Sequence, residues 1–171
     1  MKRIILALVV MFSVGSVVAQ QKIAHVNSQR LLDTLPSRKA AIEQLRKFEE
    51  NGVKELQEME AEFNKQIAIY EQNRPTMTPV IIKIEEEKLM KKQQALQERQ
   101  QSLSMELEAV SQELNTPILQ RVQKAVEIVA DRKKVGYVID ETSTLYFKGG
   151  VDITNEVATE LLRLDAEATT K

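Results

Sequence analysis

The sequence contains no cysteine in its 171 residues and only one histidine, His25. Without cysteine the chain has no disulfide and no thiol nucleophile, so its stability must come from packing or from association between copies. A lipobox cysteine is also missing, and we therefore expect no lipid anchor at the N-terminus. A single histidine cannot form a metal-binding motif of histidines at a fixed spacing, and the sequence contains no glycine-rich phosphate-binding loop. These absences predict a protein that is not an enzyme and has no cofactor.

Two features could suggest a metal or catalytic site, and both have a simpler interpretation. His25 alternates with apolar residues in a strand-like segment, which is typical of a histidine in a core or an interface. Glu85, Glu86 and Glu87 are consecutive in a helical pattern. Consecutive helix positions do not face each other, whereas hard cations bind carboxylates gathered by a turning loop. We therefore interpret these glutamates as a solvated helix face and predict no metal site.

Residues 1–19 have the features of a secretory signal peptide. Lys2 and Arg3 form a positive start, residues 4–18 are almost entirely apolar, and residues 17–19 form a small-residue cleavage site. The 15 residues of the apolar run are fewer than the about 20 that a membrane helix needs. We therefore expect cleavage after this segment and delivery of the mature chain to the periplasm.

The charge of the chain is nearly balanced, with 24 basic and 25 acidic residues. Removal of Lys2 and Arg3 with the signal peptide leaves 22 basic against 25 acidic residues, a net charge near −3. A slightly acidic chain lacks the positive surface with which proteins bind phosphate backbones. The charge therefore predicts no nucleic-acid partner.

Two long heptad-patterned segments occupy residues 37–114, and a proline-containing segment at residues 73–79 separates them. In the first segment, nine apolar residues from Ile42 to Tyr70 have a mean spacing of 3.5, the coiled-coil period. In the second, apolar residues recur every seven positions, at Ile82, Leu89, Leu96, Leu103 and Val110. The sequence thus predicts an antiparallel helical hairpin that projects roughly 50 Å at about 1.5 Å per residue.

The remaining residues, 20–36 and 115–171, predict a small discontinuous body. Strand-like segments lie at residues 22–27, 137–140 and 145–148, and the last two are expected to form a β-hairpin. The predicted fold class is therefore α+β, a small sheet body with a long coiled-coil hairpin. So small a body favours association between copies, and a monomer with a minimal core is the alternative.

Capping residues and prolines predict the helix boundaries. Asn27 is expected to cap a short helical turn, and Ser37 to cap the first long helix. Thr116 and Pro117 predict a kink or a restart in the second long helix. Gly52 lies inside the first arm at a cost in helix propensity, which indicates a bend or a close approach of the other arm.

In a coiled coil, two positions of each heptad face the other helix and form the apolar seam between the helices. In the second heptad-patterned segment, which we call the return arm, the second of these positions is polar near Glu86, Gln93 and Gln100. An incomplete apolar seam predicts compliant arms with adaptable side chains, which suit surfaces that accept many partners. The candidate contact residues on the arms are Met59, Phe63, Tyr70, Met77, Met90 and Met105. The alternative is that they fill the seam between the arms, and for the first three this is the stronger interpretation.

The chain resembles the Skp (OmpH) family of periplasmic chaperones over essentially the whole mature sequence. The resemblance rests on the signal peptide, the opening residues 22–27, the charged hairpin, and the closing residues 137–140 and 152–154. It implies a homotrimer in which the strands of three subunits build a barrel-like body and three hairpins project as tentacles around a cavity. It also implies that unfolded outer-membrane β-barrel proteins are held in that cavity without ATP.

The resemblance also indicates where subunits meet. We assign trimer contacts to the strand segments, at Ile23, His25, Val138 and Tyr146. Well-known family members are basic, whereas this mature chain is slightly acidic. The difference weakens the expectation of lipopolysaccharide binding and of electrostatic capture of clients. It leaves peripheral membrane contact open.

Two functions of different classes fit these observations. The first is an ATP-independent holdase that binds unfolded outer-membrane proteins between helical arms. The second is a structural coiled-coil spacer or adaptor of the cell envelope, whose hairpin docks onto one partner. A spacer requires a complete seam and stiff arms, whereas a holdase requires an open cavity and compliant arms. The polar seam positions and Pro117 favour the holdase.

Overall fold

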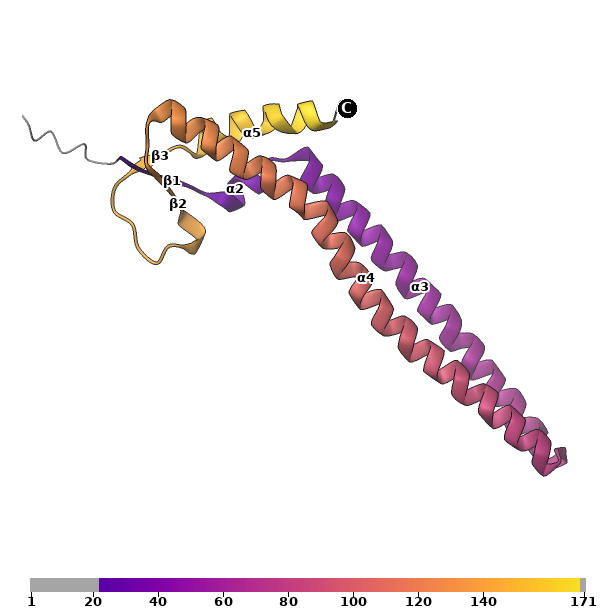
Figure 1. Ribbon diagram of the computed structural model, residues 1–171. Coiled ribbons are helices and arrows are strands. Elements are labelled where there is room, and N and C mark those ends of the chain that lie inside the picture. Colours follow the sequence, from indigo (N-terminus) through magenta and orange to yellow (C-terminus); the bar gives the residue numbers. More distant parts are fainter. Residues whose placement is uncertain (1–21, 170–171) are drawn as a thin grey trace, which may run out of the picture.

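The computed structural model describes residues 22–169, so the expected signal peptide at residues 1–19 lies outside the described part of the chain. The elements follow in the order β1, α2, α3, η1, α4, β2, η2, β3 and α5. A long helical hairpin projects from a small body that contains the strands, α2, α5 and the end of α4 (Figure 1). The structure confirms the predicted α+β class and the hairpin.

The hairpin consists of α3 (Pro36–Asn73), the short turn η1 (Arg74–Thr76) and α4 (Pro79–Lys133), and its helices run side by side (Figure 1). Both helices begin with proline, whose missing N–H costs no hydrogen bond there. The 38 residues of α3 extend roughly 57 Å at about 1.5 Å per residue. Ser37 is not the expected cap, because it lies inside α3 and its N–H donates to the Asp165 carboxylate. Among the described residues, no helix is long and apolar enough to cross a bilayer.

The two arms approach each other closely at Gly52. A Cβ atom at this position would lie 2.2 Å from Leu103 Cδ1, so a larger residue would displace the leucine. The expected close approach of the arms at this glycine is confirmed. One turn further toward the tip, Arg99 donates from Nη2 to Glu55 Oε2 across the arms at 2.9 Å. An ionic contact between the arms therefore lies directly beside this apolar contact.

α4 continues through Pro117, so the expected restart at this position does not occur. Side chains beside the proline bond to carbonyl groups of the preceding turn. The Thr116 hydroxyl donates to the Gln112 carbonyl at 2.6 Å, and the Asn115 amide donates to the Ser111 carbonyl at 2.8 Å. The next turns of α4 pack into the core of the body. This packing outweighs the loss of one backbone hydrogen bond.

The sheet contains β1 (Ile23–Val26), β2 (Tyr137–Asp140) and β3 (Val151–Asp152) in the order β2-β1-β3, with both pairings parallel. The predicted strand at residues 145–148 and its β-hairpin are therefore wrong. After β2 the chain forms the turn η2 (Glu141–Ser143). The hydroxyl groups of Thr142, Ser143 and Thr144 stabilise this turn, because each donates a hydrogen bond to Asp140, the last residue of β2. The following segment carries the chain to the opposite edge of the sheet.

The hydrophobic core lies on one side of the sheet, against α2 (Ser28–Asp33), α4 and α5 (Thr154–Thr169). Ala24 and Val26 of β1 face this core and are buried, and Asn27 caps α2 as predicted. The largest fully buried side chains are Leu31, Leu35, Val129, Ile153, Val157 and Leu161. The helices thus cover one face of the sheet and leave the other uncovered.

Candidate functional site

The uncovered face of the sheet carries large apolar side chains. Ile23 of β1 pairs in register with Tyr137 of β2, and His25 pairs with Ile139. Paired residues in neighbouring strands point to the same side of a sheet. Ile23, Tyr137 and Ile139 are 46%, 59% and 38% exposed. A cluster of exposed apolar side chains of this kind marks an interaction surface.

The segment that follows η2 continues this surface. Leu145, Tyr146 and Phe147 are all exposed. The Phe147 ring lies 4.9 Å from the His25 ring, which places the segment against the outer side of β1. We define the assembly face as the exposed apolar residues Ile23, Tyr137, Ile139, Leu145, Tyr146 and Phe147.

The trimer contacts expected from the sequence fall on both sides of the sheet. Ile23 and His25 lie on the outer side of β1, and Tyr146 lies in the adjoining segment. Val138 lies on the opposite side of β2 and packs against the core. Sequence reasoning missed the two neighbours of Val138, although the strand is apolar at three successive positions and could have indicated an apolar residue on each face.

The carboxyl end of the sheet is a polar, hydrogen-bonded corner beside the assembly face. The Nδ1 atom of His25 lies 2.6 Å from Glu141 Oε1. Burial raises the pKa of Asp140, but hydrogen bonds from Ser28 and Thr142 outweigh it and hold the pKa below its usual value. The carboxylate of Asp140 is therefore ionised and links the starts of α2 and η2.

The six candidate contact residues on the hairpin divide into two groups. Met90 and Met105 are 65% and 66% exposed. The other four are half-buried: Met59, Phe63, Tyr70 and Met77. The structure therefore places two methionines in full contact with solvent and leaves the other four residues only partly accessible.

Pockets on the hairpin contain three of these half-buried residues. Met59 lines one of about 390 Å³, and Tyr70 and Met77 line another of about 260 Å³ near the tip. The Tyr70 hydroxyl donates to Glu86 Oε1 at 2.6 Å, and this bond raises the pKa of Tyr70. Sequence reasoning missed further exposed apolar residues near the tip, Ile69, Val80, Ile81 and Ile84. The aliphatic run after Pro79 was the available signal.

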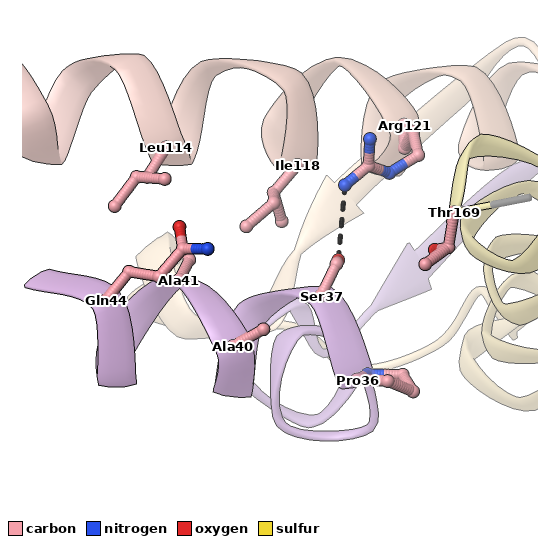
Figure 2. Close-up of a pocket in the computed structure, with 9 residues that line it drawn as sticks. All are labelled: Pro36, Ser37, Ala40, Ala41, Gln44, Leu114, Ile118, Arg121 and Thr169. Carbon is pink, nitrogen blue, oxygen red and sulfur yellow. Dashed lines mark hydrogen bonds between the residues drawn. The ribbon is translucent and has the colours of Figure 1, made fainter. Parts of the chain in front are cut away.

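The base of the hairpin contains a buried ionic contact beside a pocket of about 330 Å³ (Figure 2). Arg121 of α4 points toward Ser37 of α3 and donates from Nη2 to its Oγ at 3.1 Å (Figure 2). The Nε atom of Arg121 lies 3.1 Å from Oδ1 of Asp165, whose side chain is 3% exposed. These contacts join α3, α4 and α5 close to Pro36, the first residue of α3, and to Pro117.

Comparisons with known proteins agree with one another. Residues 22–161 match the family described as Outer membrane protein (OmpH-like). The Chaperone protein Skp of Photorhabdus laumondii is 30% identical over 146 residues, which cover 85% of this chain and 88% of that protein. The Chaperone protein Skp of Yersinia pseudotuberculosis is 38% identical over 143 residues, which cover 84% of this chain and 87% of that protein.

A solved structure has the same fold. The crystal structure of an OmpH-like protein from Caulobacter crescentus CB15, assigned as an outer membrane chaperone, aligns with a TM-score of 0.73. The alignment covers 85% of each chain at 19% sequence identity. The small body and the long helical hairpin therefore occur together in a second, distantly related protein.

Proposed function

The chain belongs to the OmpH family, which includes the Skp chaperones, and we propose that it is an ATP-independent holdase for unfolded outer-membrane proteins in the periplasm. The observation that carries this proposal is the division of the molecule into two surfaces. The body presents an uncovered apolar sheet face, and the hairpin presents exposed apolar side chains beside an incomplete seam. One surface suits assembly, and the other suits weak contact with many chains.

Assembly is proposed to produce a homotrimer. Residues 20–36 and 115–171 form the body that associates through the assembly face, and residues 37–114 form the arm. Burial of the exposed Tyr137, Ile139 and Leu145 would supply the apolar contact area that the small core lacks. Three hairpins projecting from one body would then enclose a shared space.

Holding is proposed to rely on weak apolar contacts with the arms. Met90 and Met105 are exposed and flexible, and such side chains adapt to unrelated sequences. Acidic and basic residues both surround these methionines in the sequence. The mature net charge is near −3, so the chain exerts little long-range electrostatic attraction on a client. Clients held by many weak contacts can leave when a better binding site is offered, and release then requires no nucleotide hydrolysis.

The alternative is a stiff spacer whose hairpin docks onto one envelope partner. Arg99 favours this alternative locally, because it bridges the arms to Glu55 and also pairs with Glu106 of its own helix. Most other ion pairs along the hairpin are exposed, and pairs of this kind contribute little stability. The incomplete apolar seam therefore favours compliant arms and the holdase.

The test is the aggregation of an unfolded outer-membrane protein diluted from denaturant, measured by light scattering with and without the mature chain. We expect suppression without ATP, and a mass of three subunits for the chaperone alone. Tyr137→Asp on the assembly face should dissociate the trimer, whereas Val53→Asp on the hairpin should not. A one-subunit mass for the unmodified chain would refute the assembly, and undiminished aggregation would refute the holdase.

A further inference from the structure

Three metal-ligating side chains converge at the carboxyl end of the parallel sheet. His25 lies in β1, Glu141 directly follows β2, and Asp152 ends β3. One ligand atom from each residue lies within 4.8 Å of the other two. The strand register pairs His25 with Asp152, although the two residues lie in opposite halves of the sequence. The carboxyl ends of parallel strands are where open sheets most often bind ligands.

The two carboxylates lack a fixed positive partner. Within residues 22–169, Glu141 forms an ion pair only with His25, and Asp152 forms none with lysine or arginine. Apart from this imidazole, the positive charge that acts on Asp152 is Arg30, which helps to lower the pKa of Asp152 but donates its hydrogen bond to Asn155. Elsewhere in the body, by contrast, Glu160 pairs with both Arg132 and Arg163. A bound cation would balance the corner.

Neutral donors hold the outer sides of both carboxylates. Asn27 donates from Nδ2 to Glu141 Oε2 at 3.0 Å, and the Thr154 N–H donates to Asp152 Oδ1 at 2.9 Å. Metal-binding carboxylates are commonly oriented by such outer hydrogen bonds. Each carboxylate is thus fixed on one side, and the second oxygen of Glu141 is directed at His25.

The imidazole is also fixed from both sides. The Phe147 ring lies 4.9 Å from the His25 ring. Gly150 has a φ of +97°, and a Cβ atom there would lie 3.3 Å from His25 Cδ2. The backbone can therefore close on the ring only with glycine at this position. Three ligands with fixed neighbours form a preorganised set rather than a chance cluster on an exposed loop.

We propose that His25, Glu141 and Asp152 bind one divalent transition-metal cation with the ligand preferences of zinc. One imidazole nitrogen and two carboxylate oxygens suit Zn²⁺, which binds each at about 2.0–2.2 Å. Mg²⁺ and Ca²⁺ instead favour sites made of oxygen ligands. The cation would join the ends of all three strands, and this proposal does not depend on the chaperone function.

The test is isothermal titration of tag-free mature protein, in its native assembly, with Zn²⁺ and separately with Mg²⁺. We expect one Zn²⁺ per subunit and much weaker binding of Mg²⁺. His25→Asn and Glu141→Gln should each lower the Zn²⁺ affinity at least about tenfold, since even changes to outer-shell residues cost 10–100-fold. Glu58→Gln, a matched change at an exposed hairpin residue, should leave the affinity unchanged.

The variants separate this site from adventitious binding. Circular dichroism shows whether each variant is folded, and Glu141→Gln decides the result if His25→Asn does not fold. Absence of saturable Zn²⁺ binding would overturn the proposal and leave the 2.6 Å contact between His25 and Glu141 as a structural hydrogen bond. Equal Zn²⁺ affinity in the wild type and Glu141→Gln would overturn it as well, because the ions would then be bound elsewhere.

Discussion

The body and the hairpin are stabilised by different kinds of contact. In the body, α2, α4, α5 and the inner side of the sheet bury a continuous apolar core, with side chains such as Leu31 and Leu161 fully inaccessible. In the hairpin, between residues 42 and 113, only Gly52 and Leu103 are buried. The other apolar seam residues, such as Phe48, Leu56 and Leu96, are only half-buried, and the ion pairs that cross between the arms are exposed and worth about 0–1 kcal/mol each. The molecule therefore combines a firm body with loosely joined arms.

The largest effect is expected at the junction between the two regions. Arg121→Met leaves the buried Asp165 carboxylate without its ionic partner, which should lower the free energy of unfolding by about 3–5 kcal/mol. Lys124→Met on the same helix removes an exposed pair with Glu127 and should cost less than about 1 kcal/mol. Urea unfolding followed by circular dichroism measures both. Equal losses in the two variants would show that the junction is not stabilised by this contact.

The core of the body provides the next largest effect. Leu161→Ala removes a fully buried side chain of α5 and should cost about 2–5 kcal/mol. Leu162→Ala makes the same change at the adjacent position, which is 40% exposed, and should cost about 1 kcal/mol or less. Thermal unfolding midpoints of the two variants provide the comparison, and a larger loss for Leu162→Ala would contradict the proposed core.

Within the hairpin, the close contact of the arms should be sensitive to one added methyl group. Gly52→Ala places a Cβ atom against Leu103 and should cost about 1–3 kcal/mol from overpacking, offset by up to about 1 kcal/mol of helix propensity. Amide exchange should become faster in the arms and stay unchanged in the strands. Adding Leu103→Ala relieves the clash, so the double variant should be less sensitive to Gly52→Ala than the wild type.

Acidification should have the smallest effect, and it should act on the seam. A hydrogen bond from Arg99 lowers the pKa of Glu55 below its ordinary value of 4.5. A lowered pKa in the folded chain means that the stabilisation is present above that ordinary value and is lost as the pH falls through the folded pKa. Amide exchange in the arms should therefore accelerate slightly in acid. Arg99→Gln should weaken the dependence of this exchange rate on pH. If the pH dependence were the same in the variant and the wild type, carboxylates other than Glu55 would be its cause.

The same two regions differ in how far the sequence predicts them. The hairpin follows from a local pattern, because heptad spacing between Ile42 and Val110 is visible without any distant contact. The close approach of the arms at Gly52 could also be predicted, because a glycine inside a helix has few explanations besides a bend of the helix or a close approach of another segment. Local patterns were sufficient wherever the partner residue lies on the neighbouring turn or on the facing helix.

Predictions for the body failed where the structure depends on distant residues. Residues 145–147 are apolar and resemble a strand, yet they lie exposed beside the outer side of the sheet. The two-residue β3 carries too little pattern to detect. Ser37 has the chemistry of a cap, but Asp165, 128 positions away, approaches the start of α3 instead. The approach of Glu141 to His25 depends in the same way on parallel register, which no local spacing indicates.

We propose that assembly resides in the body and holding resides in the arms. The most direct test replaces the distal hairpin, residues 56–103, with a short turn and measures both the subunit mass and the suppression of client aggregation. We predict a folded trimer that no longer suppresses aggregation, because the assembly face is intact while the enclosing walls are gone. If the armless trimer held clients as well as the full-length chain, the client-binding surface would have to lie on the body.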